Sequence, residues 1–245
     1  LCEKPMAMSL AEARRMQDAV QKAGVKFMVG MCQRWRPSHV RIRELVRQGA
    51  IGKPTFARFQ LKGSFFLYPP QSFYRKKEGL GQFFHNGAHW LDEICDFLEA
   101  VPESVYAVTT SHYLPTDRME TPNYHYASLA MDGGQVVEIE YNQLLVDPPA
   151  PTSMHILLVG DAGTLEWTDR NDAGLRLRRG DDARSLPLPT GQEREFGFAG
   201  ELDHFLDCVR NDTAPAVPIE HSIRVLAACL AVVESAATGA AIQLS

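Results

Sequence analysis

From residue 55 onward, apolar side chains recur at every second position through one short segment after another. This period is that of half-buried β-strands, and it predicts strands at 55–61, 105–111, 124–131, 136–143, 154–160, 164–167 and 175–178. Asp132, Gly133 and Gly134 separate two of these segments and indicate a tight hairpin. Strands that follow one another through short turns predict a predominantly antiparallel sheet in an α+β domain.

The amino-terminal residues follow a different pattern. Ser9 and Glu12 have the spacing of a capping box, and apolar residues then keep a helical period as far as Gly24. Residues 25–31 are apolar on both faces and predict a buried strand. If Leu1 ends an earlier strand, the helix joins two parallel strands. We therefore expect the last βαβ fragment of a parallel sheet, with the remainder upstream.

Four further segments predict helices, which cover 37–48, 82 onward, 199–209 and 219–237, and a short end strand is expected at 241–244. An antiparallel sheet with helices on one face leaves its other face open. We expect a homodimer or homotetramer formed sheet against sheet, with contacts from alternate side chains of 124–131 and 136–143.

Composition excludes several classes of protein. With 25 Lys and Arg against 30 Asp and Glu, the formal charge of −5 argues against a nucleic-acid-binding protein. The longest apolar runs are interrupted by charge or glycine before the roughly 20 residues that cross a bilayer, so no membrane partner is expected. Five scattered cysteines without a C-x-x-C pair favour a reducing compartment, and hence the cytoplasm. Because the chain starts without Met, an export signal is not excluded.

The densest polar cluster lies in the helix expected from about residue 82. His85, His89 and Asp92 have i, i+4 and i+7 spacing and share one helix face. A histidine beside a carboxylate can transfer protons near neutral pH. Two alternatives remain open: His89 is a core histidine and His85 an exposed one, or two histidines and a carboxylate bind a metal.

Other candidates have equally ordinary alternatives. Lys4, at a strand end, could polarise a substrate oxygen or could simply be a solvated charge. Arg34 and Arg36 flank Trp35 and could meet phosphate or carboxylate, although surface arginines are commoner. The apolar loop 62–78 is expected to pack over a substrate or a partner subunit.

A resemblance covers essentially the whole chain. The matching pieces are residues 2–5, Val29 and Gly30 with Arg34 and Pro37, residues 49–52, 79–92 and 160–166, and residues 201–205 before a closing helix. On these pieces the sequence resembles the carboxy-terminal two-thirds of the glucose–fructose oxidoreductase, inositol dehydrogenase and MocA-like family. Residues 1–33 would then be the last βαβ part of a Rossmann domain. Residues 34–245 would form an α+β substrate-binding and oligomerisation domain.

The resemblance implies a hydride transfer between NAD or NADP and a carbinol carbon of a sugar, cyclitol or related polyol. The family's catalytic lysine falls on Lys4, in a Lys-Pro bond that is often cis, and its catalytic histidine falls on His89. Asp92 and His85 would orient the substrate or tune His89. The resemblance also suggests which residues bind the ligands. The cofactor would be bound by Glu3, Lys4, Pro5 and Arg34. The substrate would be bound by Trp35, Phe73, Tyr74, Arg75 and His85.

Two departures from the family pattern keep other functions open. His85 stands where the family commonly has Asp, and the glycine-rich turn that binds the dinucleotide has no counterpart in these residues. A non-catalytic substrate-binding or assembly module of the same fold is therefore one alternative. Metal-dependent lyase or isomerase chemistry at His85, His89 and Asp92 is another.

Overall fold

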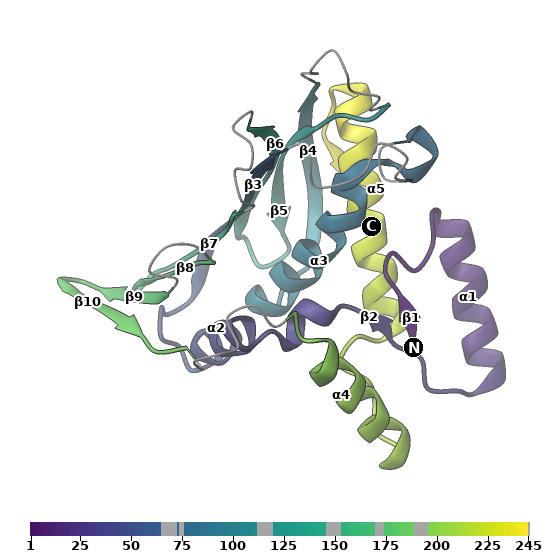
Figure 1. Cartoon of the computed structure of the whole chain (residues 1–245), viewed down its shortest axis with the longest axis horizontal. Helices are drawn as coiled ribbons and strands as arrows, with labels where there is room; N and C mark the ends of the chain where they lie inside the picture. Colours follow the sequence, from purple (N-terminus) through teal and green to yellow (C-terminus); the bar gives the residue numbers. More distant parts are fainter. Residues whose placement is uncertain are drawn as a thin grey trace.

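The computed structural model describes residues 1–64, 73, 76–111, 120–145, 153–169, 174–188 and 196–244 (Figure 1). Its helical elements are α1 (Leu10–Ala23), η1 (Cys32–Trp35), α2 (Pro37–Arg47), η4 (Lys77–Gly79), α3 (Gly81–Leu98), α4 (Phe198–Arg210) and α5 (Ile219–Thr238). Its strands are β1 (Cys2–Glu3), β2 (Val29–Gly30), β3 (Pro54–Ser64), β4 (Pro102–Thr110), β5 (Tyr124–Met131), β6 (Val136–Leu145), β7 (Ser153–Gly160), β8 (Thr164–Thr168), β9 (Leu175–Arg179), β10 (Asp182–Leu186) and β11 (Ile242–Gln243).

Within the described residues, nine strands form one sheet in the order β10-β9-β8-β7-β3-β6-β5-β4-β11. Every neighbouring pair is antiparallel except β3 and β6, which run parallel. The predicted α+β fold with a predominantly antiparallel sheet is confirmed. The predicted turn at Asp132 to Gly134 joins β5 to β6, as expected.

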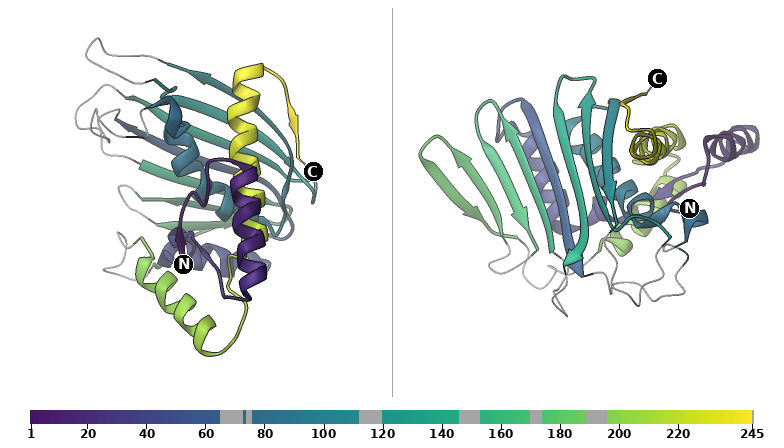
Figure 2. Two further views of the ribbon diagram at one scale, coloured as in Figure 1. Left: turned by 90° about the vertical axis from the view of Figure 1, so that its right-hand side faces the viewer. Right: turned by 90° about the horizontal axis from the view of Figure 1, so that it is seen from above.

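The sheet has one covered and one open face. Helices α2, α3 and α5 lie against the same side (Figure 2). Ala127 and Leu129 of β5 and Ile139 of β6 point to that side and are buried. On the opposite side Tyr126 and Glu138 remain partly exposed, and no described helix covers them. The alternation along each strand therefore separates the core face from the open face.

Helix α3 forms the centre of the core. Trp90, Leu91 and Ile94 are almost completely buried, and α3 packs against both α5 and β3. The helix α5 packs in turn on β4, where the backbone N–H of Ala107 donates to Ser235 Oγ at 2.8 Å. These contacts fix the position of α3, on which the predicted site residues lie.

At the amino terminus a second, two-stranded sheet pairs β1 with β2 in parallel, with Cys2 opposite Val29 and Glu3 opposite Gly30. The predicted βαβ unit is confirmed, but the strand expected over 25–31 is wrong in length. The strand β2 has only Val29 and Gly30, which pair with the two residues of β1. Val25 lies outside the strand and is 56% exposed.

The outermost strand β10 was not anticipated from the sequence. Its residues, Asp182 to Leu186, are mostly exposed and lack an apolar alternation. The strand pairs with β9 across a turn in which Gly180 has a φ of 56°. Backbone pairing to β9, rather than burial of side chains, therefore defines this strand.

The helix α5 corrects the expectation that no apolar segment approaches bilayer length. It has 20 residues with a mean hydropathy of 1.3, which is long and apolar enough to cross a membrane. Half of that segment is buried inside the molecule. Val225, Ala228 and Val232 face the core, as in the central helix of a globular domain.

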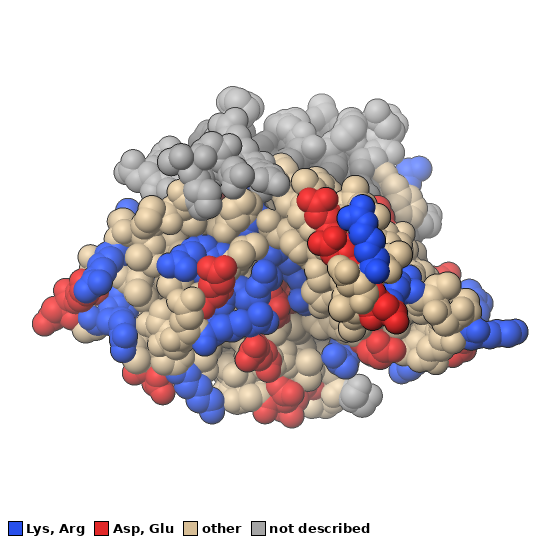
Figure 3. Space-filling model, turned by 90° about the horizontal axis from the view of Figure 1, so that it is seen from below, with Lys and Arg blue, Asp and Glu red and all other residues tan. Residues whose placement is uncertain are grey.

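Charge is mixed on the face seen from below, where Lys and Arg lie among Asp and Glu (Figure 3). Blue and red residues lie next to one another over much of this face. On the described part of that face, positive charge is therefore locally compensated.

Candidate active site

Lys4 is placed by the two-stranded sheet and the helix between its strands. The helix α1 begins at Ser9, whose Oγ accepts the backbone N–H of Glu12, and ends at Gly24 in the left-handed conformation. Because β1 and β2 are parallel, their carboxyl ends lie at the same edge, and Lys4 follows β1 there. The Lys4–Pro5 peptide bond is cis, as the family resemblance implies.

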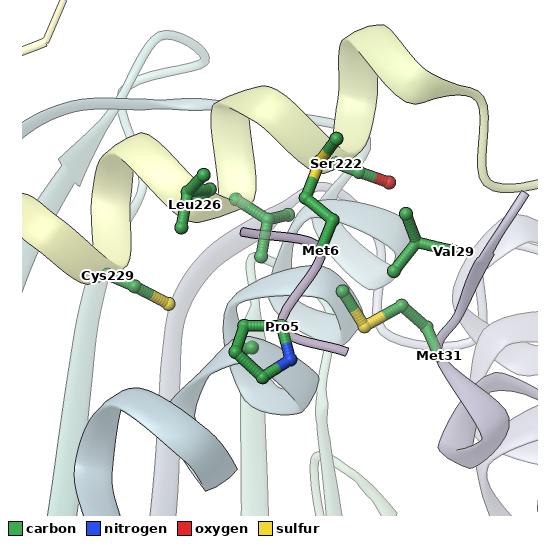
Figure 4. A pocket seen from close by; sticks show the side chains of 9 residues that line it. Pro5, Met6, Val29, Met31, Ser222, Leu226 and Cys229 are labelled. Atoms are coloured by element: carbon green, nitrogen blue, oxygen red, sulfur yellow. The ribbon is translucent and has the colours of Figure 1, made fainter. Parts of the chain in front are cut away.

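The residues after Lys4 anchor this edge in the core. Pro5 and Met6 line a small apolar pocket with Val29, Leu226 and Cys229 (Figure 4). Leu226 and Cys229 belong to α5, so the pocket joins the amino-terminal sheet to the central helix layer. This packing fixes the backbone from which the Lys4 side chain extends.

His85 lies directly against Lys4. The Lys4 ammonium is 3.1 Å from His85 Nε2 and 3.3 Å from Nδ1, and it donates to the His85 backbone carbonyl at 3.0 Å. Burial, and then the charge of Lys4, lower the pKa of His85 to about 4. Burial likewise lowers the pKa of Lys4 to about 8. The pair consequently consists of a neutral imidazole and a partly buried ammonium at neutral pH.

His89 lies one helical turn beyond His85 and is 5% exposed. Burial, and then the positive charge of Lys4, lower the pKa of His89 to about 3. Its Nδ1 is buried and has no hydrogen-bond partner among the described residues. His89 is therefore a neutral imidazole, able to accept a proton.

Asp92 is fully buried between two basic side chains from distant parts of the sequence. Arg34 donates from Nε to Oδ2 at 2.6 Å and from a terminal nitrogen to Oδ1 at 2.8 Å. His221 Nε2 lies 2.7 Å from Oδ1. Burial alone would raise the pKa of Asp92, but Arg34 and His221 bring it below its ordinary value. The carboxylate is held ionised.

Arg34, predicted at the cofactor, makes further buried contacts. Its guanidinium is 7% exposed and also contacts Asp96 at 3.2 Å and the Ala216 carbonyl at 3.4 Å. Such a side chain is committed to the protein interior, and the structure does not place it at an open cofactor surface. Arg34 therefore orients Asp92.

Two further buried groups were not anticipated from the sequence. Glu201 on α4 is 4% exposed, and its Oε2 is buried without a hydrogen-bond partner in the described structure. Burial, followed by the charge of Glu3, raises its pKa to about 7. His39 forms a buried ion pair with Glu93 beneath the site. Glu201 and His39 each stand in the sequence of an amphipathic helix, and a polar residue on the apolar side of such a helix is the signal that could have indicated them.

The predicted cofactor and substrate residues are only partly brought together. Glu3 is exposed at the end of β1, beside Lys4. Trp35 packs on α4, with its ring 5.3 Å from that of His204. Phe73 is 52% exposed. Tyr74 and Arg75 lie outside the described residues.

His85, His89 and Asp92 are not arranged as the metal site that the sequence left open. Both carboxylate oxygens of Asp92 face Arg34 or His221, whereas His85 faces Lys4. Among the described residues, no group of three or more His, Cys, Asp and Glu side chains is arranged to hold a metal ion.

Comparisons with known proteins agree with the fold. Residues 39–166 match the GFO/IDH/MocA C-terminal domain, and residues 1–31 match the oxidoreductase family with an NAD-binding Rossmann fold. The first match alone covers more than half of the chain.

Two curated relatives are named as sugar enzymes. A 1,5-anhydro-D-fructose reductase from Ensifer adhaerens is 26% identical over the whole chain, which covers 72% of that protein. A D-apiose dehydrogenase from Paraburkholderia graminis is 36% identical over 78 residues, which make up 32% of this chain and 21% of that protein. The aligned part of the chain thus spans about a fifth of one relative and less than three quarters of the other.

A solved oxidoreductase from Agrobacterium radiobacter, in complex with NAD+, L-tartaric acid and magnesium, superimposes with a TM-score of 0.84. It is 19% identical, and the match covers 99% of this chain and 72% of that one. The shared fold and the family matches lead to one conclusion: this chain belongs to the Gfo/Idh/MocA family of NAD-binding oxidoreductases.

Proposed function

We propose that this protein is a NAD(P)-dependent oxidoreductase that transfers a hydride between the nicotinamide and a carbinol carbon of a sugar, cyclitol or related polyol. One observation carries the proposal: Lys4 follows β1 at the carboxyl edge of two parallel strands and contacts His85, and the buried, neutral His89 lies one helical turn beyond His85 on the same helix. The names of the curated relatives support the same substrate class.

The residues at this edge fit the nicotinamide end of such a cofactor. Open parallel sheets bind nucleotides beyond the carboxyl ends of their strands, where Glu3 and Gly30 end β1 and β2. Glu3, Lys4 and Pro5 would hold this end of the cofactor, and either NAD or NADP is compatible with them. When bound, the cofactor supplies the hydride chemistry at the carbinol carbon.

The chain's own residues would handle the proton and the oxygen. Lys4 donates a hydrogen bond to the substrate oxygen and stabilises negative charge that develops there. As the carbon–oxygen double bond forms, the hydroxyl proton passes to His89, which returns it in the reverse reaction. Asp92, held by Arg34 and His221, sits three residues beyond His89 and favours the charged imidazolium.

Other features bear on the rest of the molecule. We propose that 1–33 forms part of the cofactor domain and 34–245 the substrate domain.

We further propose a homodimer or homotetramer through the open sheet face, where Tyr106, Val108 and Val136 are 43–47% exposed. A cytoplasmic location is proposed because all five cysteines are free thiols. These features give no reason to propose a nucleic-acid or membrane partner.

A turnover screen tests the proposed activity. The protein as its host produces it is incubated with NAD+ or NADP+ and a panel of sugars, cyclitols and sugar acids, and nicotinamide absorbance is followed. Reduction of one cofactor by one member of the panel supports the proposal. A folded protein that binds these compounds without turnover would instead be the non-catalytic substrate-binding module.

A further inference from the structure

Lys4, the cationic group of the site, has no carboxylate partner among the residues that the structure describes. Lys4 makes its described hydrogen bonds to the ring and carbonyl of His85, and it forms no ion pair within the described residues. Where the family commonly has Asp, this chain places an imidazole against the ammonium. The imidazole of His85, unlike a carboxylate, brings no negative charge to Lys4.

The groups around Lys4 are neutral as well. Burial raises the pKa of the Cys32 and Cys229 thiols to about 12, so both are uncharged. His85 and His89 are neutral imidazoles. A desolvated ammonium among neutral groups is poorly compensated, because burying a charge without a partner is costly.

Among the described residues, no nearby carboxylate forms an ion pair with this ammonium. Asp92 is occupied by Arg34 and His221, and Glu201 has its pKa raised to about 7. The charge of Glu3, adjacent in sequence, acts to raise the pKa of Lys4, but its side chain is exposed and makes no described ion pair with Lys4. Lys4 itself is only partly buried, so a ligand can reach it.

From this geometry we propose that the substrate is a sugar acid, a polyhydroxy carboxylate whose anionic group pairs with Lys4 beside His85, in addition to the hydrogen bond that the same ammonium donates to the carbinol oxygen. The inference rests on the proposed function and narrows its substrate class from polyols in general to carboxylated ones. The bound carboxylate supplies a counter-charge that no described side chain of this site supplies. It also offsets the Lys4 charge that lowers the pKa of His89, which makes His89 a better proton acceptor.

Matched ligands separate the effect of charge from that of shape. D-Gluconate has a carboxylate where D-glucitol has a hydroxymethyl group, and the two compounds are otherwise the same. D-Glucuronate and D-glucose form a second pair with the same difference. Binding of all four is measured by titration calorimetry, with and without NAD+, on the protein as its host produces it. Binding is the readout, so failure of hydride transfer alone does not affect this test.

Two substitutions at one position complete the design. His85→Asp places a carboxylate against Lys4, whereas His85→Asn, the matched control, removes the imidazole without adding charge. We expect the wild type to bind the better acid at least about tenfold more tightly than its neutral counterpart, a ratio that corresponds to the interaction of one partly screened charge pair. His85→Asn keeps that ratio, and His85→Asp reduces it to about one.

Three results would overturn the proposal. They are equal binding of acid and neutral counterpart, no binding of any of the four compounds by folded wild-type protein, and an unchanged preference in a folded His85→Asp variant. Thermal unfolding of each variant establishes that it is folded. Binding of the acid without any cofactor reduction would leave this inference standing and count against the proposed activity.

Discussion

Arg34 and Asp92 form a buried two-pronged ion pair across 58 positions of sequence, with nitrogen–oxygen distances of 2.6 and 2.8 Å. The pair joins η1, which follows the amino-terminal sheet, to α3, which carries both histidines. It therefore couples the position of the helix to that of the strand edge bearing Lys4. His221 extends the contact to α5 at 2.7 Å.

The first prediction concerns the stability of this pair. Arg34→Met leaves Asp92 buried without its principal counter-charge and should lower the free energy of unfolding by about 3–5 kcal/mol. Asp92→Asn in the same chain removes the stranded charge, so the double variant should lose less than the sum of the two single variants. Urea titrations of the four proteins measure this coupling. Additive losses would show that the pair does not act as a unit.

The second prediction concerns Glu201. Its pKa is raised to about 7, above the value in an unfolded chain, so the folded state is stabilised below about pH 4.5 and loses that advantage as the pH rises through 7. Glu201→Gln has no such loss. The variant should therefore gain stability relative to the wild type between about pH 5.5 and 8.5. Denaturant unfolding at both pH values measures the difference, and a constant difference would contradict the prediction.

How far the sequence predicts this molecule depends on what defines each element. Strands β5 to β8 bury one face and expose the other, so their periodicity located them closely. The strand β10 buries few side chains, so no apolar alternation predicts it. The predicted length of β2 was too great, because the apolar residues of one strand do not show how many of them its neighbour will pair with. The cluster of His85, His89 and Asp92 followed from helical spacing together with the family resemblance.

Other parts of the site could not be predicted from local pattern. His221 lies 129 positions from Asp92, and nothing in the apolar period of α5 indicates which carboxylate it meets. The pairing of Arg34 with Asp92 could not be predicted, because an exposed arginine and a buried one look alike in sequence. Contacts between distant segments depend on tertiary packing, which the periodicity of one segment does not encode.

The third prediction concerns His125, which is buried. Its ring stacks on that of Phe83, with 5.1 Å between the two ring centres. Burial lowers the pKa of His125 to about 3. The unfolded chain binds this proton at a higher pH, so the folded state is progressively destabilised as the pH falls below about 6.5.

His125→Phe retains an aromatic ring and removes the titrating group. Between about pH 7 and pH 4.5 the variant should lose less stability than the wild type, because only the wild type carries the proton linkage of His125. Denaturant unfolding at several pH values measures the two slopes. Parallel pH profiles would contradict the assigned shift.

The fourth prediction concerns the open sheet face. Val108→Asp adds charge to an apolar position on β4 that is 43% exposed, and it should convert the proposed oligomer to a monomer at micromolar concentration. Val25→Asp, at a position that is 56% exposed after α1, is the control and should leave the assembly intact. Light scattering measures both masses. A monomeric wild type would remove the proposed interface.

The central claim is that His89 moves the substrate proton during hydride transfer. The most direct measurement is nicotinamide reduction by the wild type and by His89→Asn, each with the preferred substrate and cofactor. We predict a fall in kcat of at least about 100-fold with cofactor affinity nearly unchanged, because general base catalysis contributes about that much. A folded His89→Asn variant that retains the wild-type kcat would contradict the account.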